Sequence, residues 1–80
     1  MLTSRALRWQ CRRGMRELDV LLTNWLERHY AAADNARKAV FERLLALPDN
    51  ELNDYILGGK VPRDPVAADV VKQIRGSAQT

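Results

Sequence analysis

The chain has 80 residues, of which 46% are hydrophobic and 29% are charged, and a formal net charge of +3 at pH 7. A chain this short forms one domain at most and buries only about 60–65% of the surface of its unfolded state, which disfavours a deep internal active site. The single cysteine excludes an intramolecular disulfide, and no apolar run reaches the ~18 residues that a membrane-spanning helix needs.

The positive charge is concentrated near the N-terminus. Residues 1–16 contain five arginines and no acidic residue, which gives +5, whereas residues 17–80 contain eight basic and ten acidic residues, which gives −2. An Arg-rich, acid-free start is also typical of a mitochondrial presequence, but a helical pattern already begins there, near Ser4. We therefore expect a bacterial cytoplasmic protein that is mature from Met1.

The first helix is expected to begin at Ser4, which can serve as N-cap, and to run to about Arg13. Its apolar residues recur at helical spacings: Leu2, Ala6 and Trp9, with Leu7 and Cys11 alongside. Gly14 follows as the residue that tolerates a positive φ just after a helix. Arg12 and Arg13 would then lie in the last turn, where free carbonyl groups favour positive charge.

A second helix is expected to begin between Met15 and Glu17 and to end near Tyr30. Glu17 would lie in its first turn, where free N–H groups favour a carboxylate. The apolar positions have the spacing of an amphipathic helix: Leu18, Leu21, Leu22, Trp25, Leu26 and, with its hydroxyl near water, Tyr30.

Two more helices are expected on either side of Pro48. The third is capped by Asp34 or Asn35 and ends at the proline, because proline cannot continue a helix. Its buried residues are expected to be Val40, Phe41, Leu44, Leu45 and Leu47. The fourth is capped by Asp49 and ends at glycines 58 and 59, with inward-facing residues Leu52, Tyr55 and Ile56.

Asp64 and Pro65 form an N-cap and first-turn pair that predicts a fifth helix. Its apolar residues are Val66, Val70, Val71 and Ile74. No stretch alternates like a strand, so the sequence predicts an all-α protein, a compact five-helix bundle. We expect a single domain over residues 1–80, with a core of about 3–75 and a frayed tail at 76–80.

Candidate functional residues gather between the first two helices, in Arg12-Arg13-Gly14-Met15-Arg16-Glu17-Leu18-Asp19. A helix that ends at a glycine just before another begins makes a tight corner with exposed backbone groups. Arg13 could reach outward to a carboxylate or phosphate, and Glu17 could accept a hydrogen bond or pair with an arginine. Gly14 would let another chain approach closely because it has no Cβ. The alternative is a purely structural C-cap beside a solvated basic face.

The segment Arg13-Gly14-Met15-Arg16-Glu17 resembles the RGxxE signature of the succinate dehydrogenase assembly factor 2 family, whose bacterial members are the FAD assembly factors called SdhE. The resemblance continues through Phe41-Glu42-Arg43-Leu44-Leu45 and residues 49–56 to the helix at 62–74, and covers roughly residues 3–75. It implies a five-helix protein that is not itself an enzyme. Proteins of this family bind the flavoprotein subunit of succinate dehydrogenase or, in bacteria, fumarate reductase, and promote covalent attachment of FAD to a histidine of that subunit.

The resemblance implies that the partner-binding residues are those of the signature region: Arg12, Arg13, Gly14, Met15, Arg16 and Glu17. FAD is expected to be attached to the partner and not held stably by this chain, which has no Gly-rich phosphate-binding loop. No membrane insertion or nucleic acid is expected, and the free protein is expected to be a monomer.

Other functions remain open. Five arginines in sixteen residues could serve a small nucleic-acid-binding or antitoxin-like regulatory protein, although Glu17 and Asp19 would repel phosphates. A helical adaptor for an unrelated partner could use Trp9 and Met15 as anchors. Cys11 could carry a thiol activated by the neighbouring arginines, but the favoured interpretation is a half-buried packing residue. One histidine, His29, and one cysteine far apart do not indicate a metal site.

Overall fold

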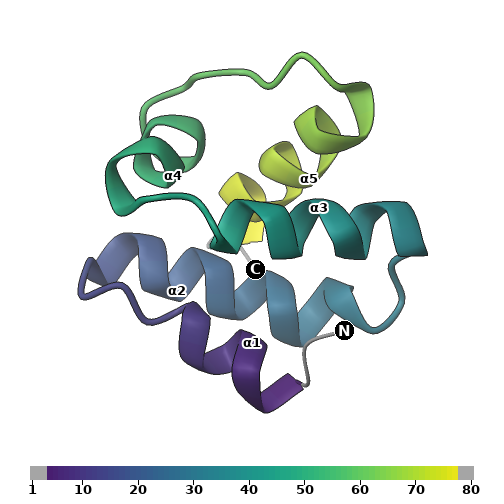
Figure 1. Ribbon diagram of the computed structural model, residues 1–80, viewed down its shortest axis with the longest axis horizontal. Coiled ribbons are helices and arrows are strands. Elements are labelled where there is room, and N and C mark those ends of the chain that lie inside the picture. Colours follow the sequence, from purple (N-terminus) through teal and green to yellow (C-terminus); the bar gives the residue numbers. More distant parts are fainter. Residues whose placement is uncertain (1–3, 78–80) are drawn as a thin grey trace.

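The computed structural model describes residues 4–77, which form five helices and no strand. The helices are α1 (Ser4–Gln10), α2 (Arg16–Trp25), α3 (Asn35–Leu45), α4 (Asp49–Ile56) and α5 (Pro65–Gly76). A π-helical turn, η1 (Leu26–Tyr30), extends α2 without a break. The expectation of an all-α five-helix protein is confirmed. In Figure 1, α1 and α2 form the lower part of the molecule, α3 crosses the middle, and α4 and α5 lie above it.

The apolar face of α2 is the centre of the core. Its residues at helical spacing are buried as expected: Leu18, Leu21, Leu22 and Trp25, followed by Leu26 in η1. The Trp25 ring lies against the Phe41 ring of α3 with centroids 4.5 Å apart. Its Nε1–H donates to the side-chain oxygen of Gln73 at 3.0 Å, which joins α2 to α5. Burial of these large side chains is the main favourable term in the folding of so small a domain.

The expected N-cap residues of α3, α4 and α5 can be compared with the structure, and two of the three are confirmed. Asp34 accepts from the backbone N–H of Arg37 at α3, and Asp64 accepts from the backbone N–H of Ala67 at α5, which begins with Pro65. At α4 the expectation was wrong, because Pro48 occupies the cap position and Asp49 is the first helical residue. The carboxylate of Asp49 is engaged elsewhere, by Arg13.

Helix α1 ends at Gln10, three residues before the end that the sequence predicted. Leu7 of α1 and Cys11, which follows the helix, are fully buried, whereas the side chain of Trp9 points away from the core. The buried side of α1 is therefore that of Leu7 and not that of Trp9. The proposed cap at Ser4 and the apolar position Leu2 lie outside what the structure describes of side chains.

The tail was expected to fray from Gly76, but Gly76 is the last residue of α5 and Ser77 caps it. The Ser77 hydroxyl is buried and donates to the carbonyl of Gln73 at 3.0 Å. Residues 78–80 lie outside the described part. Tyr30 is half-buried at the end of η1, and its hydroxyl donates to Glu42 at 3.0 Å. Among residues 4–77, none of the helices has both the length and the apolar character to span a bilayer.

Candidate docking corner between α1 and α2

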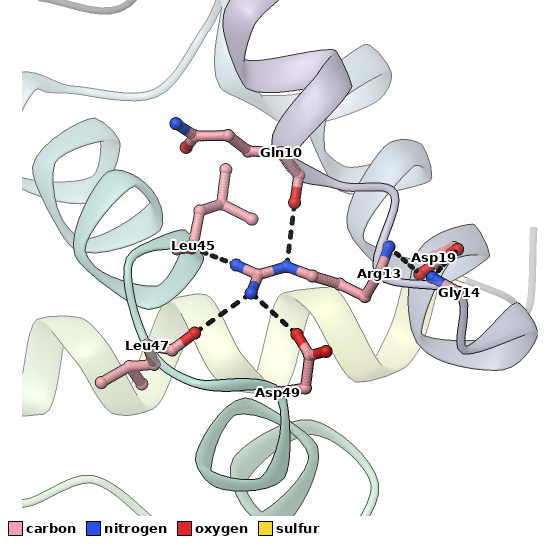
Figure 2. Close-up of polar contacts among 7 residues, drawn as sticks. All are labelled: Gln10, Arg13, Gly14, Asp19, Leu45, Leu47 and Asp49. Carbon is pink, nitrogen blue, oxygen red and sulfur yellow. Dashed lines mark hydrogen bonds and ion pairs between the residues drawn. The ribbon is translucent and has the colours of Figure 1, made fainter.

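The segment that joins α1 to α2 makes a sharp corner, which we define as residues 11–17 (Figure 2). Gly14 has φ +77°, a left-handed conformation that side chains other than glycine rarely adopt. Asp19, in the first turn of α2, accepts from the backbone N–H of Arg13 at 2.8 Å and of Gly14 at 3.2 Å. One carboxylate therefore holds both peptide groups of the turn in place.

The side chain of Arg13 points into the protein, only 14% exposed (Figure 2). Its Nε donates to the carbonyl of Gln10 at 2.9 Å, at the end of α1. One terminal nitrogen donates to the carbonyl of Leu47 and to Asp49, and the other donates to the carbonyl of Leu45. These carbonyl groups lack helical donors because α1 and α3 end there. The expected outward reach of Arg13 is thus replaced by a link between two helix ends and the start of α4.

The rest of the corner faces outward. A Cβ placed on Gly14 would meet nothing within 4 Å, so open space lies in front of this residue. Arg16 and Glu17 are exposed in the first turn of α2, and the Glu17 carboxylate makes no hydrogen bond or ion pair with any residue that the structure describes. Arg12 is also exposed. Met15 is half-buried and packs against the core, so it supports the corner from behind.

Cys11 begins the corner and faces the core. Burial raises the pKa of its thiol to about 11, against the smaller opposing effects of a hydrogen bond with Thr23 and of nearby arginine charge. The thiol is therefore neutral at physiological pH. This excludes activation of Cys11 by the arginines and makes it a packing residue, more fully buried than expected.

Two contributors to the corner were missed from the sequence. Asp19 was considered only for its charge, although an acidic residue in a first turn that follows a Gly loop is well placed to accept loop N–H groups. Three acceptors of Arg13 lie 32 to 36 residues further along the chain, where no local pattern marks them as its partners. The one indication in the sequence was the short connection around Pro48, which places the end of α3 close to the start of α4.

Among the described residues, those of the corner and its surroundings do not form a metal-binding cluster. The described residues include no cluster of three metal-ligating side chains. His29 is exposed on η1 beside Trp25, with ring centroids 6.2 Å apart. The corner exposes Gly14, the Glu17 carboxylate and two arginines, whereas the side chain of Arg13 faces inward. The fold and the corner together describe a small helical protein with an exposed polar turn between its first two helices.

Comparison with known proteins identifies the family. A family model described as "Flavinator of succinate dehydrogenase" matches residues 5–78. The chain is 43% identical over 72 residues to the FAD assembly factor SdhE of Shewanella oneidensis, covering 90% of this chain and 88% of that protein. It is 36% identical over 74 residues to the FAD assembly factor SdhE of Coxiella burnetii, with coverage of 92% and 90%. The chain belongs to this family of FAD assembly factors of succinate dehydrogenase.

Proposed function

We propose that this protein binds the flavoprotein subunit of succinate dehydrogenase and promotes covalent attachment of FAD to it, without itself catalysing the reaction. A homologous fumarate reductase subunit would be a second client. The observation that carries the proposal is the corner, where Gly14 faces open space and the Glu17 carboxylate has no partner within the described residues. We further propose that the protein acts in the cytoplasm as a monomer.

The physical contribution of such a protein is positioning. Covalent attachment requires the flavin ring to be held against the histidine that will bind it, and a docked protein can favour that arrangement of the client. The N–H and C=O groups near Gly14 and the Glu17 carboxylate can bind polar groups on the client surface. Arg13 would act indirectly, because its guanidinium holds the corner from inside.

Gly14→Arg tests this proposal, and Gly59→Arg is its matched control. Gly59 has φ +81° and also faces open space, but it lies in the α4–α5 connection. Both variants should lose a similar ~1–2 kcal/mol through left-handed backbone strain. When each is co-expressed with the flavoprotein subunit, only Gly14→Arg should abolish covalent flavin, measured as flavin fluorescence of that subunit in a denaturing gel. Equal flavinylation by the two variants would contradict the role of the corner.

Glu17→Ala gives a second test with no backbone strain. Glu51 is its control, because it too is exposed in the first turn of a helix, α4. Flavinylation should fall with Glu17→Ala and stay at the wild-type level with Glu51→Ala, while the helical circular dichroism of both is unchanged. Loss of activity in both variants would point to a general effect of surface charge instead.

The free protein should not hold FAD, because the chain has no Gly-rich phosphate-binding loop. Titration of FAD followed by its fluorescence measures this directly. A Kd in the micromolar range or tighter would show that the protein delivers the cofactor rather than positioning the client.

A further inference from the structure

A basic aromatic patch covers the outer side of α1, and we call it the Trp9 patch: Arg5, Ala6, Arg8, Trp9 and Arg12. Trp9 is 72% exposed, more than any other large hydrophobic side chain in the described residues. An indole ring gains free energy when it leaves water, and tryptophan is strongly enriched among residues that dominate binding at protein interfaces. An indole exposed to this extent is therefore a candidate contact residue.

The orientation of Trp9 is fixed by the rest of α1. Leu7 and Cys11 are fully buried. Successive residues of an α-helix are about 100° apart around its axis, so Trp9, two residues from each of them, lies on the opposite side. The Arg12 guanidinium lies over the indole ring, 5.9 Å from its centroid, which restricts both side chains. The indole thus lies on the solvent side of α1, with the Arg12 guanidinium over its ring.

The charge of the patch is positive and mostly uncompensated. Arg8 forms an ion pair with Glu27 at 2.8 Å. Arg5 and Arg12 form no ion pair with any acidic residue in the described part of the chain. A surface complementary to the patch must therefore carry carboxylates around an apolar socket that accepts an indole.

The Trp9 patch is continuous with the corner through Arg12. This residue lines the hollow beside Arg5 and Trp9, and also a second hollow beside Gly14 and Val20. A third hollow, between Trp9 and Leu45, again includes Arg12. A partner that contacts Gly14 would therefore meet Trp9 at the same time.

We infer that the Trp9 patch is a second contact region for the flavoprotein subunit, with the indole seated in an apolar socket and Arg5 and Arg12 facing acidic side chains around it. This inference rests on the proposed function and names the chemistry of the client surface. A nucleic acid fits the combined surface less well, because Glu17 and Asp19 at its other end repel phosphates.

The two kinds of residue act on different steps of binding. Arginines at an interface rim accelerate association in a salt-dependent way, whereas a buried aromatic anchor slows dissociation. Trp9→Ala should therefore raise the dissociation rate, and Arg5→Glu with Arg12→Glu should lower the association rate. Both changes are on exposed side chains, so folding should be preserved.

The matched controls lie in the α4–α5 connection, on the side of the molecule away from α1 (Figure 1). Val61 is 68% exposed, so Val61→Ala removes an apolar group of similar exposure, and exposed Arg63 allows the same charge reversal in Arg63→Glu. Circular dichroism and thermal melting verify that all variants are folded.

The experiment measures binding to immobilised flavoprotein subunit by surface plasmon resonance, alongside covalent flavinylation. Trp9→Ala should raise Kd at least about tenfold, mainly through dissociation. The double charge reversal should slow association several-fold at ~50 mM salt, with the difference largely lost at ~500 mM. Flavinylation by Trp9→Ala should recover at high protein concentration, because the defect is in docking. Val61→Ala and Arg63→Glu should stay within about twofold of wild type.

Three results would overturn the inference, and only the second of them is also a failure of the proposed function. If wild type binds and flavinylates the subunit but Trp9→Ala and the double reversal match it, the patch is not a contact region and only the inference fails. If wild type neither binds nor flavinylates the subunit, the proposed function fails and the inference with it. Tight binding of random duplex DNA at ~150 mM salt, lost on reversal of Arg5 and Arg12, would assign the patch to nucleic acid and also refute the inference.

Discussion

Arg13 and Glu17 lie four residues apart in the corner but have opposite environments. The Arg13 guanidinium has internal partners on α1, the end of α3 and α4, whereas the Glu17 carboxylate faces solvent. Arg13 therefore holds the corner together, whereas Glu17 is available to a partner. Stability and activity measurements should separate the two roles.

Arg13→Ala should lower the free energy of unfolding by about 2–3 kcal/mol, because it leaves carbonyl groups of two helix ends without their charged donor. The adjacent Arg12 is the control: its side chain is exposed, and Arg12→Ala should change stability by less than about 0.5 kcal/mol. Urea denaturation followed by circular dichroism measures both. Equal midpoints would mean that the internal bonds of Arg13 contribute nothing net to folding.

Cys11 should make stability depend on pH in the alkaline range. The folded protein raises the pKa of the thiol from 9.0 to about 11 by burial, so it holds this proton more tightly than the unfolded chain does. The contribution is complete below pH 9 and is lost as pH rises to about 11. Other groups titrate there too, so the measurement is the difference in unfolding free energy between wild type and Cys11→Ala across this range. A constant difference would show that the thiol is not desolvated.

The connection between α1 and α2 depends on a single carboxylate. Asp19→Ala removes the acceptor for the N–H groups of Arg13 and Gly14, and we expect a loss of about 1–2 kcal/mol. Asp19→Asn keeps one oxygen and should be intermediate. Amide hydrogen exchange of residues 13 and 14 should accelerate in the same order, and flavinylation should decline with it. Asp54→Ala, an exposed aspartate of α4, is the control and should show neither effect.

Some helices could be predicted from the sequence more completely than others. Helix α2 has enough residues for its apolar period to fix both the helix and its buried face, and α5 has an Asp-Pro start that fixes its first residue. Helix α1 has seven residues, too few for the period to decide whether Leu7 or Trp9 faces the core. That choice is made by contacts with α3, which the local sequence does not contain.

The corner itself was predicted in part. The positive φ of Gly14 and the exposure of Glu17 follow from residue type and position in the turn. The inward side chain of Arg13 depends on α3 ending beside α1, which is a property of the assembled bundle. Local chemistry thus predicts where the turn lies, and tertiary packing decides which of its side chains remain available to a partner.

The five helices together support the corner between α1 and α2. Its extents are 28 × 27 × 26 Å, so the core is small and its largest buried side chain, Trp25, contributes to several contacts at once. The indole packs on Phe41 and bonds to Gln73 of α5, and neither group belongs to the corner. Stability and docking should therefore be separable by substitution at distant places.

Trp25→Phe should lower the free energy of unfolding by about 1–3 kcal/mol, because it removes the bond to Gln73 and leaves unfilled volume beside Phe41. At temperatures where the variant remains folded, flavinylation of the client should equal that of wild type, because the corner keeps its own bonds through Asp19 and Arg13. Glu17→Ala should give the reverse: an unchanged midpoint and lost flavinylation. Thermal melting and the in-gel flavin signal measure the two properties on the same samples. A folded Trp25→Phe protein with impaired flavinylation would show that docking requires the whole core to be rigid, and that the corner does not act as an independent unit.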